Sequence, residues 1–210
     1  MATLPEMFAT DKVEIITGVF TVVGLVIAII GLFQTVSSIR QASKLASEDR
    51  RAALLQAQED LRWRQTVEAQ RAIRRMLDDE QANDAMTMMD WDGQEFSIKG
   101  KSMPVLHADV RGALKPTREL FTDKQVFIRD RMDAFLGHLE LLQQGIEAKI
   151  FTVDDVAFPI DYYIDQINSN IGMDIFKKYI VAFNFPRSAT IVDSILKRRA
   201  EVRAKDGISK

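Results

Sequence analysis

A long uncharged segment near the N-terminus limits the folds that this chain can adopt. Ile15–Ile39 contains 25 residues without a formal charge. At a rise of about 1.5 Å per residue, such a helix reaches about 37 Å, enough to cross a hydrocarbon core of about 30 Å with some tilt. A signal peptide would need a basic start and a shorter apolar run, and a soluble core helix is rarely apolar on every face. The segment therefore predicts a single transmembrane helix over residues 15–39.

The basic residues that flank this segment predict its orientation. Only Lys12 precedes the segment, whereas four basic residues follow it closely: Arg40, Lys44, Arg50 and Arg51. Basic residues resist translocation, and next to the bilayer they can pair with anionic lipid headgroups. We therefore expect a single-pass membrane protein. Its short N-terminal segment, residues 1–14, would lie outside, and its C-terminal domain would lie in the cytoplasm.

Small residues within the predicted span lie on one side of the helix. They recur at spacings of 4, 3, 4, 3 and 4 residues, at Thr17, Thr21, Gly24, Ala28, Gly31 and Thr35. Small side chains allow two helix backbones to approach closely, and Thr hydroxyl groups can donate hydrogen bonds across such a contact. The pattern predicts that the span associates with other copies, so we expect a homo-oligomer.

Two segments connect the span to the rest of the chain. Residues 40–80 are rich in Ala, Gln, Arg, Glu and Leu, which favours a helical connector, and residues 40–75 hold nine basic and five acidic side chains. Residues 81–101 follow as an acidic turn region, because seven acidic and no basic residues lie between Asp78 and Glu95. Carboxylates that alternate before Gly93 resemble a calcium loop, but the spacing of an EF-hand is not met. We therefore interpret this region as the turn that ends a helix.

Apolar periodicity in residues 102–210 predicts a bundle-like helical domain. The clearest helix should begin at the N-cap Thr122 and end at Gly145, because apolar residues recur between them at spacings of 4, 3, 4 and 3. Those residues are Ile128, Met132, Phe135, Leu139 and Leu142. Other helices should begin or end at Ser102, Pro104, Pro116, Thr152, Gly172 and Pro186. Strands are expected at most over Glu95–Ile98 and Val105–His107, so the predicted fold class is all-α.

Several classes of function are excluded or disfavoured by the composition. The chain has no Cys and two His, which excludes thiol nucleophiles and cysteine zinc sites, and we expect no metal and no cofactor. The net charge of −2 and the pI near 5.8 argue against nucleic acid as a partner. The basic tail, residues 197–210, is interpreted as a solvated helix end. No nucleophile elbow, phosphate loop or dinucleotide fingerprint occurs in the sequence.

One polar cluster remains as a candidate partner or ligand site. Its residues are Trp91, Arg129, Asp130, Asp133 and His138. Asp130 and Asp133 lie within one helical turn, so they could act as an acid–base pair. Alternating Arg and Asp on the polar side of a helix more often form surface ion pairs. We therefore predict that the domain is not catalytic.

Three stretches carry a resemblance to a known group of proteins. They are Trp63–Gln65, Met88–Phe96 and Ile128–Leu136. On these stretches and the N-terminal span, the chain resembles uncharacterised bacterial single-pass, membrane-anchored proteins with a helical cytoplasmic domain. The resemblance implies placement in a bacterial inner membrane and implies no activity.

Three functions follow as hypotheses. The first is a membrane-tethered, non-enzymatic scaffold that self-associates and binds a cytoplasmic protein partner. The second is a ligand-regulated membrane effector, for example of a bacterial defence or stress system, whose cytoplasmic domain senses a small molecule. The third is a hydrolase centred on Asp130 and Asp133. Growth arrest on expression would favour the effector, whereas harmless expression would favour the scaffold.

Overall fold

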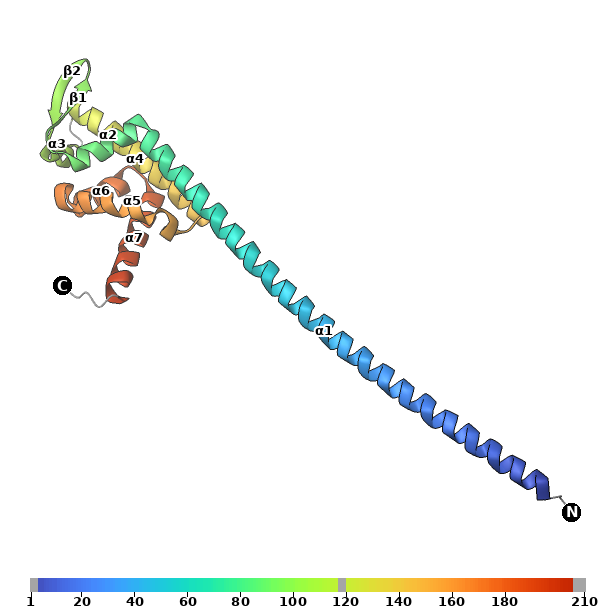
Figure 1. The fold of residues 1–210 in the computed structure, drawn as a ribbon. Coiled ribbons are helices and arrows are strands. Elements are labelled where there is room, and N and C mark those ends of the chain that lie inside the picture. The colour runs from blue at the N-terminus through green and yellow to red at the C-terminus, as the bar shows by residue number, and fades with distance from the viewer. Residues whose placement is uncertain (1–3, 117–119, 206–210) are drawn as a thin grey trace. The chain divides into compact units, whose positions relative to one another are not determined.

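Helices form most of the computed structural model of the chain, which describes the backbone of residues 4–116 and 120–205 and the side chains of residues 31–116 and 120–204. The described residues form seven α-helices, one π-helical segment and one hairpin (Figure 1). The helices are α1 (Leu4–Asp78), α2 (Glu80–Asp90), α3 (His107–Ala113), α4 (Asp123–Glu147), α5 (Val153–Gln166), α6 (Met173–Ala182) and α7 (Pro186–Lys205). The prediction of a mainly α-helical chain is confirmed.

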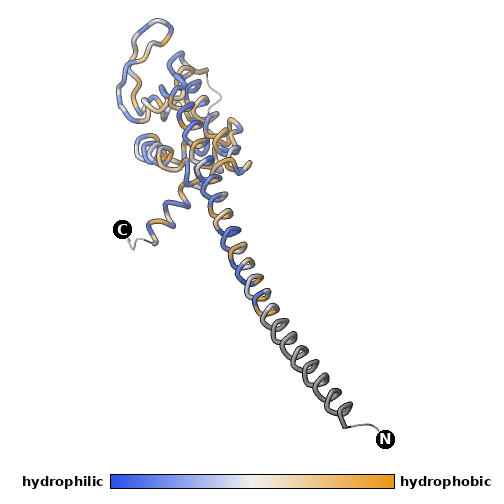
Figure 2. The backbone as a smooth tube through the Cα atoms, turned by 45° about the vertical axis from the view of Figure 1, so that its right-hand side comes forward, coloured by the Kyte–Doolittle hydropathy of each residue, from blue (hydrophilic) through white to orange (hydrophobic). Residues whose placement is uncertain are grey.

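The chain divides into two units, residues 1–60 and residues 61–210. In the first unit, every residue from 31 to 60 is exposed, and Figure 2 shows hydrophilic and hydrophobic residues interspersed there. In the second unit, the last turns of α1 already belong to the core, because Ala69 and Met76 are fully buried. The compact unit therefore begins at residue 61, within the segment 40–80 that was predicted to be a connector, whereas the helical domain was predicted to begin at residue 102.

The predicted membrane span falls mainly on residues whose side chains lie outside the described part. Residues 15–30 belong to α1, but nothing of their side chains is described. Among the described residues, no helix combines the length and the apolar character that crossing a membrane requires. At the C-terminal end of the predicted span, the hydroxyl groups of Thr35 and Ser38 donate to the carbonyls of Gly31 and Thr35, at 2.8 and 2.9 Å.

The acidic region contains a helix, which corrects the prediction that residues 81–101 form a turn, and the first strand of a hairpin, which matches the strand expected over Glu95–Ile98. Asp79 separates α1 from α2, and its Oδ1 accepts from the backbone N–H groups of Gln81 and Ala82 at 2.9 and 3.0 Å. This cap starts a new helix immediately after α1 ends. One side of α2 is then buried through Ala82, Ala85, Met86, Met88 and Met89. The acidic residues of this segment do not by themselves indicate a helix, so the sequence did not predict α2.

The hairpin joins β1 (Gln94–Ile98) to β2 (Lys101–Val105) in antiparallel register. Lys99 and Gly100 form the two-residue turn, with φ of 49° and 78°, as in the turns that match the twist of paired strands. Because β2 occupies residues 101–105, the short helix predicted to open at Ser102 begins only at His107.

Helix α4 lies at the centre of the domain and packs against α2, α3 and α7 (Figure 1). The apolar stripe predicted for this helix is confirmed, because Ile128, Met132, Phe135, Leu139 and Leu142 are all at most 1% exposed. Thr122 caps its N-terminus, as predicted. The predicted end at Gly145 is wrong, because the helix continues to Glu147. A Cβ atom at Gly145 would overlap the ring of Phe151, so this glycine allows a close contact rather than a stop.

Candidate functional site

The predicted site residues Arg129 and Asp133 contact side chains from α6, which is distant in sequence. Arg129 is 7% exposed, and its Nη1 donates to the carbonyl of Ala113 at 3.0 Å. Its guanidinium carbon lies 4.0 Å from the ring centre of Phe121 and 4.2 Å from that of Phe183. A guanidinium group stacks well on aromatic faces, so Arg129 joins α4 to the segments around it.

The carboxylate of Asp133 is engaged by a buried phenol. The hydroxyl group of Tyr179 donates to Oδ1 of Asp133 at 2.6 Å. Burial raises the pKa of Asp133, although the Tyr179 hydrogen bond and the Arg129 charge act in the opposite direction. Burial and the neighbouring Asp133 raise the pKa of Tyr179, which keeps the phenol protonated as a donor. Asp130 is exposed. The two carboxylates therefore occupy different environments, and this arrangement stabilises packing.

The other two predicted site residues lie elsewhere in the domain. His138 Nε2 lies 3.2 Å from Oδ2 of Asp79, the residue that caps α2. The N–H of Ala82, and after it His138, lower the pKa of Asp79. Trp91 follows α2 and is 67% exposed. The predicted cluster is therefore not one site. Arg129, Asp130 and Asp133 lie together on α4, His138 lies beside Asp79, and Trp91 lies apart after α2.

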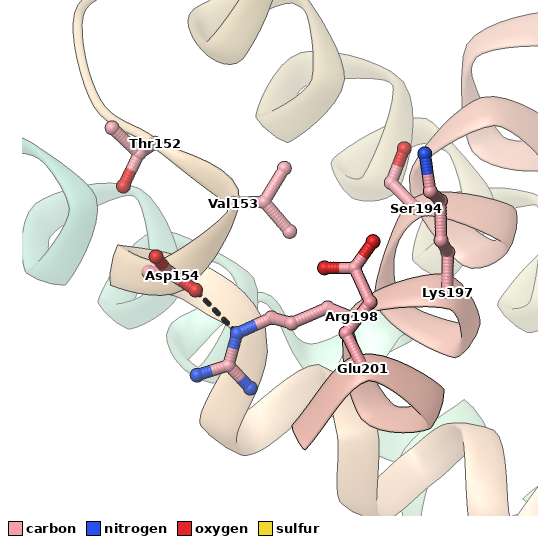
Figure 3. A pocket seen from close by; sticks show the side chains of 7 residues that line it. All are labelled: Thr152, Val153, Asp154, Ser194, Lys197, Arg198 and Glu201. Atoms are coloured by element: carbon pink, nitrogen blue, oxygen red, sulfur yellow. Dashed lines mark hydrogen bonds and ion pairs between the residues drawn. The ribbon is translucent and has the colours of Figure 1, made fainter. Parts of the chain in front are cut away.

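A polar pocket of about 350 Å³ lies between the N-terminus of α5 and the last turns of α7 (Figure 3). It is lined by Thr152, Val153, Asp154, Ser194, Lys197, Arg198 and Glu201. Nε of Arg198 forms an ion pair with Asp154 across it. Cationic and anionic side chains both line the pocket, so its charge favours neither an anion nor a cation as a ligand.

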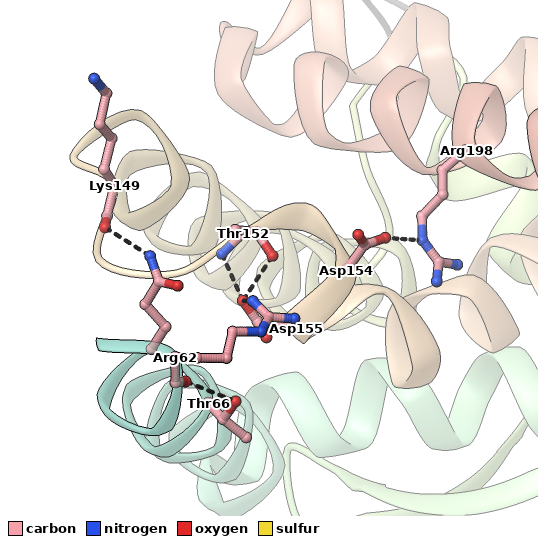
Figure 4. Close-up of polar contacts among 8 residues, drawn as sticks. Arg62, Thr66, Lys149, Thr152, Asp154, Asp155 and Arg198 are labelled. Atoms are coloured by element: carbon pink, nitrogen blue, oxygen red, sulfur yellow. Dashed lines mark hydrogen bonds and ion pairs between the residues drawn. The ribbon is translucent and has the colours of Figure 1, made fainter. Parts of the chain in front are cut away.

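The adjacent residue, Asp155, ties the same end of α5 to α1 (Figure 4). Its Oδ2 accepts from the backbone N–H and the hydroxyl group of Thr152 at 2.8 and 2.7 Å, and from Nη1 of Arg62 at 3.1 Å. Burial acts to raise the pKa of Asp155, but the hydrogen bonds from Thr152 and the charge of Arg62 lower it overall. Gln65 also donates to the carbonyl of Lys149 at 3.4 Å. The start of α5 is thus bonded to both α1 and α7.

An apolar hollow of about 460 Å³ lies on the surface between the end of α1 and α5. We call it the α1–α5 patch, and it is lined by Leu77, Phe158, Pro159, Asp161, Tyr162, Tyr163 and Asp165. Phe158 is 91% exposed, Tyr162 49% and Leu77 43%. Contiguous exposed apolar groups of this kind mark interaction sites. This hollow is therefore a candidate partner-binding surface.

Comparison of the chain with protein-family models, curated proteins and solved structures found no match. The function must therefore be inferred from the chain's own residues.

Sequence reasoning missed the α1–α5 patch although a signal was present. The predicted buried side of the helix after Thr152 ran through Ile160, Tyr163, Ile164 and Ile167, and Phe158 lies off that stripe. A large aromatic residue on the polar side of an amphipathic helix is the observation that could have identified the patch. Within the described part of the chain, no group of three or more His, Asp or Glu side chains is placed to hold a metal ion.

Proposed function

We propose that this protein is a membrane-tethered, non-enzymatic interaction module that self-associates through its N-terminal span and binds a cytoplasmic protein through its helical domain. The observation that carries the proposal is the 25-residue uncharged segment Ile15–Ile39, followed by basic residues. Tethering raises the local concentration of the domain at the membrane surface, which is itself a function. The resemblance to bacterial membrane-anchored proteins supports an inner-membrane location.

Two features of the described residues support a role without catalysis and with self-association. Asp133 and Arg129 are occupied by Tyr179 and by aromatic rings, which is a packing role. At the end of the span, the Thr35 hydroxyl group donates to the Gly31 carbonyl of its own helix, so Thr35 itself brings no unpaired polar group to a contact with another helix.

Sedimentation of the full chain tests the tether. Wild-type protein should remain in the membrane pellet after alkaline carbonate extraction and should be released by detergent. The matched variant carries Leu25→Arg and Ile29→Arg, and each Arg at the centre of a span opposes insertion by about 3 kcal/mol, so this variant should appear in the supernatant. Wild-type protein in the supernatant would refute the proposal.

The absence of Cys allows a direct test of orientation. Ala2→Cys should react with a membrane-impermeant maleimide added to intact spheroplasts, whereas Ser209→Cys should react only after lysis. The reverse pattern would place the domain outside.

A ligand-regulated membrane effector is a second candidate function, favoured by one observation. Asp154 pairs with Arg198 in the polar pocket, and the next residue, Asp155, pairs with Arg62 of α1. A small molecule that displaced Arg198 would therefore act beside the contact that joins α5 to α1. The effector function predicts growth arrest on expression, relieved by Gly31→Leu in the predicted seam, whereas the scaffold function predicts harmless expression of both chains.

A further inference from the structure

Two aromatic side chains of the α1–α5 patch, Phe158 and Tyr162, lie outside the core of their own domain, whereas the third, Tyr163, packs against it. The buried side of α5 consists of Val156, Ala157, Ile160 and Ile164. Phe158 and Tyr162 are spaced i, i+4 and therefore lie together on a different side of the helix. Leaving a phenylalanine 91% exposed places a large apolar area in water, which folding does not require. The patch is therefore available to another molecule.

The charged residues that line this apolar surface are acidic. Two of its seven lining residues, Asp161 and Asp165, are acidic, and none is basic. Arg199 of α7 pairs with both carboxylates, so one positive charge faces two negative ones. The side chain of Asp165 remains 57% exposed. A third carboxylate, Asp90, raises the pKa of Tyr162, first through the side-chain hydrogen bond between them and to a smaller extent through its negative charge.

This charge distinguishes between two occupants. In a symmetric contact between two copies, the same patch faces itself, so the carboxylates of one copy would approach those of the other. Like charges brought together in this way disfavour association. A partner with basic residues around an apolar centre would instead meet the acidic rim with opposite charge.

The surroundings also determine the kind of segment that fits. Six of the seven lining residues belong to α5 and one, Leu77, to the end of α1, so the lining is helical and includes no strand edge to which an extended peptide could add. An apolar hollow with helical walls accepts the apolar side of another helix, whose anchoring residues recur at i, i+4 and i+7. Exposed aromatic residues in such a groove are typical energetic centres of binding.

We propose that the α1–α5 patch binds an amphipathic helical segment of a partner protein that presents an apolar stripe flanked by Lys and Arg. This inference rests on the partner-binding part of the proposed function. It does not depend on the membrane tether.

Selection from a peptide library tests the proposal. Full-length protein in phosphatidylcholine nanodiscs is used to select from a phage-displayed library of random peptides of about 16 residues, which form a helix of about 24 Å. Empty nanodiscs and the Phe158→Ser chain serve for counter-selection. Retained peptides should carry net positive charge and apolar residues at helical spacing. Retained peptides that are acidic or have no helical spacing, or a failure to retain any, would overturn the proposal.

Affinity measurements on the best retained peptide complete the test. Phe158→Ser should raise the Kd at least about tenfold, and the combined Asp161→Asn and Asp165→Asn variant should weaken binding and flatten its salt dependence. Val181→Ser is the matched control, because Val181 is 77% exposed on α6, outside the lining of the patch. It should bind like wild type. Circular dichroism must show that each variant is folded, and equal binding by folded wild-type and Phe158→Ser chains would overturn the proposal.

If the α1–α5 patch instead bound a second copy of this chain, a different experimental result would be expected. Cross-linking of the full chain in nanodiscs would then detect cross-links between helical domains that Phe158→Ser abolishes, and that result would replace the basic partner by a copy of this chain. Failure of the tether would instead appear as soluble wild-type protein whose peptide binding is intact, so the two proposals fail separately.

Discussion

Two charged residues of α4 show how a polar side chain can serve packing rather than chemistry. Arg129 lies against aromatic rings, and Asp133 accepts from Tyr179, which is 46 residues away in the sequence. Lysine could not replace Arg129, because an ammonium group lacks the planar surface that stacks on rings. The Arg–Asp pattern, for which an acid–base pair was the alternative to ion pairs, includes two residues, Arg129 and Asp133, whose contacts are those of a half-buried helix.

Truncation of the two neighbouring carboxylates should have unequal effects. Asp133→Ala leaves the buried Tyr179 hydroxyl without its acceptor and should lower the free energy of unfolding by about 1–3 kcal/mol. Asp130→Ala removes an exposed side chain and should change it by less than about 0.5 kcal/mol. Chemical denaturation of the full chain in detergent micelles, followed by circular dichroism, gives both values. Equal losses would contradict the assigned role of Asp133.

Among the elements, α4 shows that the same residue type can serve different purposes along one helix. Gly145 is buried and lies against the Phe151 ring, whereas a Cβ atom at Gly137 would meet nothing within 4 Å. Only the first glycine is needed for its lack of a side chain.

Replacing each of these glycines by alanine therefore has opposite expected outcomes. Gly137→Ala should stabilise the domain by about 0.4–1 kcal/mol, because alanine restricts the unfolded chain and favours the helix. Gly145→Ala should destabilise it by about 1–3 kcal/mol, because the Phe151 ring must move. Thermal unfolding measures both, and a stabilised Gly145→Ala chain would refute the close contact.

The break between α1 and α2 depends on Asp79 in two ways, as a cap and as the partner of His138. Asp79→Ala removes both contacts and should cost about 1 kcal/mol or more. Asp79→Asn retains the cap but loses the ionised partner of His138, so it should cost less. Thermal unfolding at neutral pH distinguishes them, and equal destabilisation would show that the cap contributes nothing.

For the whole molecule, carboxylates that hold elements together make stability depend on pH. Asp79, Asp109 and Asp155 have pKa values lowered from the ordinary 3.8. Their stabilising contribution is complete above that value and is lost as the pH falls through the lowered pKa of the folded state. Asp133, with a raised pKa, acts in the opposite direction, because its protonation favours the folded state.

Acidification should therefore lower the Tm of the full chain between about pH 4 and pH 2. Asp155→Asn should make this dependence less steep, because one carboxylate with a lowered pKa has been removed. Asp130→Asn is the control and should leave the slope unchanged. Thermal unfolding at a series of pH values provides the measurement, and an unchanged slope for Asp155→Asn would contradict the role assigned to its contacts with Thr152 and Arg62.

Self-association of the whole molecule should depend on the small-residue stripe. Gly24→Leu places a bulky side chain in the predicted contact and should reduce cross-linked oligomers of the full chain in membranes. Gly18→Leu is the matched control, since Gly18 lies off the stripe. Equal loss of oligomers in both variants, or in neither, would reject the predicted seam.

The helical class and the buried stripe of α4 were predictable from sequence alone, because Ile128, Met132, Phe135, Leu139 and Leu142 repeat at the period of a helix. The N-cap at Thr122 was predictable for the same reason, because a cap depends on residues that are neighbours in the chain. Local patterns act over a few residues and so can be recognised without the fold.

Tertiary structure decided the features that depend on distant residues. Helix α2 was not predicted, because its sequence is acidic and one side of it is buried only by packing against α4. The partners of Asp133 and Arg62 lie 46 and 93 residues away, and no local pattern specifies them. Phe158 is an ordinary apolar residue until the packing of α5 leaves it on the surface beside Leu77. Tertiary packing decides which side of each helix is buried. The residues that remain exposed, and so could bind a partner, therefore cannot be identified before the packing is known.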